Sequence, residues 1–226
     1  MQDGTLATEN TTFSILPKTK HLILCEGKDD EVFLNTFLKS DIFTQYDVEQ
    51  VQVMQVHGKA NYCNTVKVLV NADGFSHIQS LLIIRDADAN LQSAADSVKG
   101  VFSSVSLPVP PTEYQWRSDG SIKTAFLLMP SCDSGSQSGM LEDLCWEILT
   151  EKHGPLIRGE VEGFIDSLEN SGKRTYSHKS KALIHTYFSA TDALIASSIG
   201  RASESGTFDW TSPKLTPLRD FIISML

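Results

Sequence analysis

The chain has 226 residues, 41% hydrophobic and 21% charged, which suits one large domain with a buried core. Its 11 Phe, 5 Tyr and 3 Trp argue against global disorder. The net charge of −9 argues against a broad nucleic-acid-binding surface, and no apolar run approaches the roughly 18 residues needed to cross a bilayer.

Short apolar runs alternate with helical patterns through the first 105 residues. Strands are predicted at 21–25, 48–56 and 81–84, and helices at 30–39, 61–70 and 91–105. This alternation indicates right-handed βαβ units and a mostly parallel sheet. In such a sheet, ligands bind beyond the carboxyl ends of the strands.

The second half of the chain begins with a predicted hairpin, in which residues 113–117 and 122–129 flank Asp119-Gly120. A Ser/Gly loop is expected at 131–139. Helices are predicted at 140–150, 156–168, 179–188, 192–198 and 215–226. We therefore expect a flexible lead at 1–17, an α/β domain at 18–150, and a helical extension at 151–226 packed on it.

The N-terminus and the cysteines indicate a cytoplasmic protein. The N-terminal segment is polar and acidic and does not resemble a signal peptide, so we expect no membrane association. The cysteines lie far apart and form no CxxC pair, which argues against a zinc site. We expect reduced, mostly buried thiols at Cys25, Cys63, Cys132 and Cys145.

Carboxylates follow two of the predicted strands. Glu26 ends the first strand, and Asp30 lies four residues later in the first helical turn. Asp86 and Asp88 follow the third strand, where residues two apart in an extended segment project to the same side. Carboxylates that converge at one sheet edge repel one another, and a hard cation such as Mg²⁺, Mn²⁺ or Ca²⁺ would relieve that repulsion. Each motif alone is more often an ordinary loop or helix cap.

Two segments resemble a known family. HLILCEGKDDEVFL and LLIIRDADAN are similar to the Toprim domain, which carries a Glu after its first strand and a DxD after its third. The ExxxD pattern of Glu26 and Asp30 most resembles that of the OLD (overcoming lysogenisation defect) type nucleases. The segment FLLMPSCDSGSQSGMLEDLCWEIL resembles one in a small bacterial Toprim-like family of unassigned function.

The resemblance extends over roughly residues 18–226. It implies a Toprim-like (Rossmann-like) three-layer α/β fold with a central, mostly parallel sheet, plus a helical C-terminal part.

Further charged residues have two interpretations. Glu142, in the first turn of a predicted helix, is either an ordinary helix-start acid or an additional metal ligand. Residues 170–191 contain no acid, and their bases either form a solvated face or contact phosphate. The candidate nucleic-acid contacts are Lys28, Lys173, Arg174, Lys179 and Lys181.

These features lead to a functional hypothesis of Mg²⁺-dependent (or Mn²⁺-dependent) phosphodiester chemistry on DNA or RNA, with a nuclease as the first expectation. Glu26 would be a general base or metal ligand, and Asp30, Asp86, Asp88 and Glu142 would hold metal. The alternatives are another phosphotransfer enzyme on the same scaffold and a non-catalytic module that binds nucleic acid or a partner ATPase. A separate ATPase as partner and the oligomeric state stay open.

Overall fold

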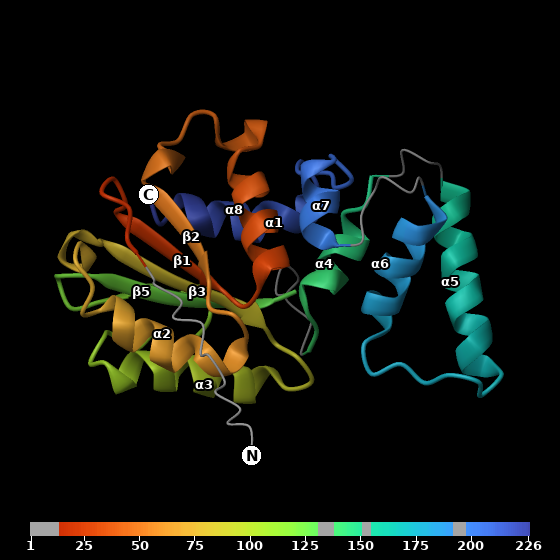
Figure 1. Ribbon diagram of the computed structural model, residues 1–226, viewed down its shortest axis with the longest axis horizontal. Helices are drawn as coiled ribbons and strands as arrows, with labels where there is room; N and C mark the ends of the chain where they lie inside the picture. Colours follow the sequence, from red (N-terminus) through yellow and green to blue (C-terminus); the bar gives the residue numbers. More distant parts are fainter. Residues whose placement is uncertain (1–13, 131–137, 151–154, 192–197) are drawn as a thin grey trace, which may run out of the picture.

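The structure is a computed structural model that describes residues 14–130, 138–150, 155–191 and 198–226 (Figure 1). Its described strands form one five-stranded sheet in the order β2-β1-β3-β5-β4. All neighbouring strands are parallel except β4, which pairs antiparallel with β5 at one edge. The strands are β1 (His21–Cys25), β2 (Val51–Gln55), β3 (Ser80–Asp86), β4 (Arg117–Ser118) and β5 (Lys123–Met129).

Helices cover both faces of this sheet. In Figure 1, α2 and α3 lie on one face and α1 and α8 on the other, while α5 and α6 lie side by side beyond the carboxyl ends of the strands. The helices are α1 (Lys28–Leu38), α2 (Tyr62–Leu69), α3 (Leu91–Ser104), α4 (Leu141–Glu147), α5 (Pro155–Asn170), α6 (Lys179–Ala190), α7 (Ile199–Glu204) and α8 (Thr216–Ile223). The predicted α/β class, mostly parallel sheet and helical C-terminal part are confirmed.

Alternating residues of the four parallel strands enter two hydrophobic cores. Leu22 and Leu81 join the core under α2 and α3, whereas Ile23 and Leu82 join the core on the opposite face. Because both faces are covered, β1 and β3 each contain a continuous apolar run, LILC and LLII, rather than an alternating pattern. The second core also includes buried residues of α1 and of α4–α8, so the C-terminal helices share a core with the sheet.

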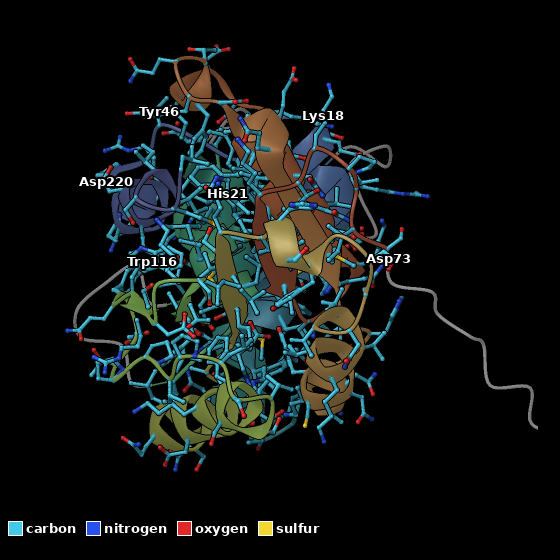
Figure 2. The ribbon with its side chains drawn as sticks, turned by 90° about the vertical axis from the view of Figure 1, so that its left-hand side faces the viewer. Lys18, His21, Tyr46, Asp73, Trp116 and Asp220 are labelled. Atoms are coloured by element: carbon cyan, nitrogen blue, oxygen red, sulfur yellow. The ribbon has the colours of Figure 1, made fainter. Side chains whose placement is uncertain are left out.

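The last helix is tied to the antiparallel edge. The Trp116 ring stacks on Phe221, with ring centroids 5.0 Å apart, and its indole nitrogen donates to Ser224 Oγ at 2.9 Å. Lys123 Nζ donates to the Ser224 carbonyl at 2.8 Å. Figure 2 shows the end of the sheet at which β1 begins, opposite the carboxyl edge, with Trp116 and His21 labelled. These contacts hold α8 against β5 and leave the carboxyl edge to α4 and α6.

Several predicted elements are shorter than expected, among them the strand predicted at 113–117, of which only Arg117 belongs to β4. The predicted strand at 48–56 begins only at Val51, because Val48–Gln50 forms a 3-10 turn. The helix predicted at 140–150 ends at Glu147, because the following backbone pairs with residues 207–209: the Asp209 amide donates to the Ile148 carbonyl at 2.8 Å. Most of the predicted lead 1–17, loop 131–139 and helix 192–198 lies outside the described residues, as does Cys132.

The other described cysteines, Cys25, Cys63 and Cys145, are free thiols, and Cys25 and Cys145 are buried. Within the described ranges, no helix is both long enough and apolar enough to cross a membrane.

The close approach of α7 to α1 predicts a sensitive position at Gly200. Its amide donates to Asp29 Oδ1 at 3.1 Å, and a Cβ there would lie 3.0 Å from Val32 Cβ. Because Val32 Cβ cannot move without the backbone, Gly200→Ala should lower the free energy of unfolding by about 1–3 kcal/mol. Urea denaturation measures this change.

Gly100, within α3, is the control because no atom lies within 4 Å of a Cβ built there. Gly100→Ala should leave stability unchanged or raise it by up to about 1 kcal/mol, since Ala favours helix. Equal effects of the two substitutions would contradict the tight α1–α7 contact.

Candidate active site

Glu26 lies directly beyond β1, at the carboxyl edge of the sheet. Its backbone carbonyl accepts a hydrogen bond from the Gly58 amide at 2.8 Å, which ties the end of β1 to the loop after β2. Its side-chain oxygen Oε2 is buried and has no hydrogen-bond partner among the described atoms. Burial raises the pKa of Glu26, Arg85 opposes that rise, and Asp88 adds to it. The site therefore contains a buried acceptor that lacks a donor.

Asp30 is fixed by the start of α1. The Gly27 amide donates to Asp30 Oδ2 at 3.1 Å, and a Cβ at Gly27 would lie only 3.3 Å from that oxygen. A small residue at position 27 thus lets Asp30 fold back toward Glu26. Burial raises the pKa of Asp30 to about 6, and the nearby Glu26 and Glu142 carboxylates contribute to that rise.

Asp86 ends β3 and is held by the start of α4. The Leu141 amide donates to Asp86 Oδ1 at 2.9 Å. Burial raises the pKa of Asp86 to about 8; Asp30 is the next contributor, and Glu142 and Glu26 add smaller effects. The neutral, protonated form of Asp86 is therefore favoured near pH 7 when nothing positive lies beside it.

Gly139 allows the segment before α4 to pair with the backbone of Asp88, the last residue of the DxD motif. Asp88 and Gly139 exchange backbone hydrogen bonds of 2.8 Å in both directions. Gly139 has φ +140°, and a Cβ there would lie 2.6 Å from Pro130 Cδ. Only glycine fits this approach, which places the next residues over Asp86 and aims Glu142 at the same sheet edge.

The extended path expected from Asp86 to Asp88 is not observed. Asp88 has φ +54°, so the chain turns after β3 and the rule that residues two apart share a side does not hold. Asp88 Oδ2 instead pairs with Lys59 Nζ at 2.8 Å and with Arg85 Nη2 at 3.4 Å. Asp88 remains near enough to raise the pKa of Glu26, but its charge is balanced by these two bases.

One cavity of about 400 Å³ gathers most of the predicted acids. It is lined by residues from the loops after β1 and β2, from α1, from the end of β3, and from α4, α6 and α7, among them Glu26, Asp30, Asp86, Glu142 and Lys181. Glu142 is only 8% exposed, and its Oε1 pairs with Lys181 Nζ at 3.1 Å. The structure thus brings these four carboxyl groups to one place and leaves Asp88 outside the cavity lining.

The carboxyl groups are not preassembled around an ion. Among the described residues, no group of three or more His, Cys, Asp or Glu side chains is arranged to hold a metal as it stands. Lys181 and Lys59 each pair with one of the nearby acids, Glu142 and Asp88. Their role as metal ligands stays a prediction.

The bases predicted to contact nucleic acid differ in whether they already form ion pairs with acids. Lys28 Nζ pairs with Glu31 at 2.5 Å, and Lys179 Nζ lies 2.6 Å from both Asp166 and Glu169. These two carboxylates raise the pKa of Lys179 and cancel its charge toward a ligand. Lys173 and Arg174 are exposed and form no ion pair within the described residues.

Sequence reasoning missed Arg85. This side chain is 6% exposed, donates to the Asp86 carbonyl at 3.1 Å and pairs with Asp88. An arginine at the end of an apolar strand, directly before DxD, is the pattern that could have identified it, because a buried guanidinium needs an acidic partner.

The raised pKa of Asp86 predicts how the metal-free protein responds to pH. An unfolded Asp titrates near about 3.9, whereas folded Asp86 keeps its proton up to about pH 8. Between these values the folded state binds more protons, so the free energy of unfolding falls as pH rises, by at most about 1.4 kcal/mol per unit. Urea unfolding in EDTA should show that the free energy of unfolding falls less steeply with pH for Asp86→Asn than for wild type. The amide oxygen of the new side chain can still accept a hydrogen bond from the Leu141 amide.

The control for this series is Asp96→Asn, which changes an exposed carboxylate on α3 whose Oδ1 accepts from Gln92. It should keep the wild-type slope. Other titrating groups, such as the buried His21, are present in all three proteins and cancel in the comparison. Identical slopes for wild type and Asp86→Asn would contradict the raised pKa.

Comparisons with known proteins complement this geometry. A search of curated proteins finds no match. Among solved structures, the C-terminal region of the Burkholderia pseudomallei OLD protein is 13% identical, with 92% of this chain and 99% of that chain covered and a TM-score of 0.45. The C-terminal region of the Xanthomonas campestris pv. campestris OLD protein is 16% identical, with 91% and 93% covered and a TM-score of 0.43.

The family comparison covers residues 20–226, nearly the whole chain, and agrees with the expected family of unassigned function. The chain belongs to the family described as protein of unknown function (DUF3226).

Proposed function

We propose that this protein cleaves phosphodiester bonds in nucleic acid with the help of Mg²⁺ or Mn²⁺. The observation that carries the proposal is the gathering of Glu26, Asp30, Asp86 and Glu142 around one cavity. Separate segments of the chain supply them, at the edge of the sheet where α/β folds bind ligands. A structural role alone would not require so many carboxyl groups in one partly buried place.

The residues present fit a hard divalent cation. The candidate donors are carboxylate oxygens, which Mg²⁺ and Mn²⁺ prefer. Glu26 Oε2 lacks a partner, and burial together with mutual repulsion favours protons on Asp86 and Asp30. Glu26 and Asp86 would hold the ion, with Asp30 and Glu142 beside them. A bound ion would supply the positive charge that stabilises developing charge on the phosphoryl oxygens.

Glu26 is suited to take a proton from the attacking water. Burial raises the pKa of Glu26, and a raised pKa makes a carboxylate a stronger general base. Its partnerless oxygen faces no competing donor within the described part of the chain. Asp86, which is oriented by the Leu141 amide, would only hold the ion, whereas Glu26 would serve in both roles.

Two lysines, Lys28 and Lys181, line the cavity that holds Glu26, Asp30, Asp86 and Glu142, here called the carboxylate cavity, and Lys181 is suited to contact a phosphate. Lys181 pairs with Glu142, while its side chain is still 55% exposed. Such a lysine can exchange its carboxylate partner for a phosphate oxygen when substrate enters. Because the chain resembles Toprim proteins in its motifs, the phosphate is assigned to a nucleic acid rather than to a small phosphoester.

The ion pairs at the site favour one alternative function, a non-catalytic binding module. Lys181 with Glu142 and Lys59 with Asp88 neutralise two acids without any metal, as a non-catalytic module that binds nucleic acid or a partner ATPase would allow. Metal binding and cleavage distinguish this module from the nuclease. A need for a separate ATPase is tested by adding candidate partners to the cleavage reaction.

Metal should stabilise the folded protein, because an ion held by the native cavity is not held by the unfolded chain. In millimolar Mg²⁺ or Mn²⁺, the Tm of wild type should rise above its value in EDTA. Asp86→Asn should abolish that rise, whereas the exposed Asp96→Asn should keep it. A wild-type Tm unmoved by either metal would count against the site.

Cleavage should depend on the same carboxylates. With labelled single- and double-stranded DNA and RNA in Mg²⁺ or Mn²⁺, Asp86→Asn and Glu26→Gln should each lower the rate at least ~10²-fold, the scale of one lost electrostatic stabiliser. The Asp96→Asn control should cleave at the wild-type rate.

Cleavage that survives Asp86→Asn combined with Glu26→Gln would arise at another site and would overturn the assignment. Metal binding without cleavage of any of these substrates would favour the binding module.

A further inference from the structure

A second cavity, of about 550 Å³, lies between residues 174–178 and one face of α6. Its charged and polar lining includes Arg174, Tyr176, His178, Lys181, His185 and Ser189, and no Asp or Glu lines it. In a chain with net charge −9, a cavity whose charged lining residues are all basic is unusual. We call it the basic groove.

The basic groove adjoins the carboxylate cavity. Lys181, in the first turn of α6, lines both. Figure 1 shows α6 next to α4, the helix that carries Glu142, on the side of the molecule where the parallel strands end. A ligand bound across Lys181 would therefore occupy the two cavities at once.

Acids near the groove are already engaged elsewhere. Asp166 and Glu169 on α5 pair with Lys179, and Asp143 on α4 accepts a hydrogen bond from Ser180. Arg174 forms no ion pair with any described residue, and its side chain lines the groove. Because Lys181 is paired with Glu142, the positive charge of the groove that is available to an anion is that of Arg174.

We propose that the basic groove binds the sugar-phosphate backbone of the nucleic-acid strand next to the phosphate that is cleaved. This proposal rests on the proposed function and specifies how its substrate is held. Arginine presents paired N–H donors that match phosphate oxygens, and histidine and serine add further donors. The contact is to phosphate, so the groove serves DNA and RNA alike.

The geometry also indicates which bases of residues 170–191 can contact the strand. Arg174 and Lys181 line the groove, whereas Lys179 is held by its two carboxylates on the α5 side. Backbone contact should accordingly depend on Arg174 and not on Lys179.

The test is binding without cleavage. Fluorescence anisotropy in EDTA would measure the Kd of wild type for a short labelled single strand, in one arm DNA and in the other RNA, over a range of salt concentrations. Arg174→Ala should raise Kd about tenfold, the scale of one lost charge-assisted hydrogen bond. It should also reduce the slope of log K against log salt by about 0.7. Adding His178→Ala should weaken binding further.

Lys18→Ala is the matched control, because it removes one positive charge from the opposite edge of the sheet, where Figure 2 labels this residue. Lys18 is 82% exposed and has only a 4.0 Å contact to Glu49, so its loss should leave Kd nearly unchanged. A thermal melt of each variant checks that the fold is intact, which is expected because Arg174 is exposed.

Equal Kd values for Arg174→Ala and Lys18→Ala, or no binding by wild type, would overturn the proposal. If wild type cleaves with metal while Arg174→Ala binds and cleaves normally, the groove assignment fails and the nuclease stands. If Arg174→Ala weakens binding but wild type never cleaves, the groove stands and the nuclease fails.

Discussion

Repulsion between carboxyl groups held close together in a poorly hydrated place is the constraint on which this site depends. Burial and mutual repulsion raise the pKa of Asp86 to about 8 and of Asp30 to about 6. The fold tolerates this because a backbone amide of α4 and one of the loop before α1 each donate to an acid. Protons, lysines or a divalent cation must supply the remaining compensation, so the site is poised to exchange one for another.

Backbone placement and acid placement are coupled in this fold. The exchange of hydrogen bonds between Asp88 and Gly139 joins the end of β3 to the segment that starts α4, and so brings Glu142 to acids on β1 and β3. α6 then supplies Lys181 to Glu142 and opens the basic groove beside it. The helical C-terminal part thereby contributes both to the hydrophobic core and to the candidate substrate path.

Much of the fold could be predicted because its determinants are local. Apolar runs such as HLILC and the Asp119-Gly120 turn specify β1 and the β4–β5 hairpin within a few residues. The carboxyl edge could be predicted as the place of Glu26 and Asp86, since parallel strands end together there. The left-handed backbone at Asp88, the early end of α4 and the pairing of Lys179 with α5 depend on contacts distant in sequence, which spacing does not contain.

The most direct test of this site is the number of protons released when metal binds. Isothermal titration calorimetry of Mn²⁺ or Mg²⁺ into wild type near pH 7, repeated in buffers with different ionisation enthalpies, gives that number. Because Asp86 is mostly protonated there without metal, binding should release about one proton per ion, and fewer from Asp86→Asn. Failure to bind either ion, or binding that releases no proton, would contradict the claim that a cation displaces protons from these carboxyl groups.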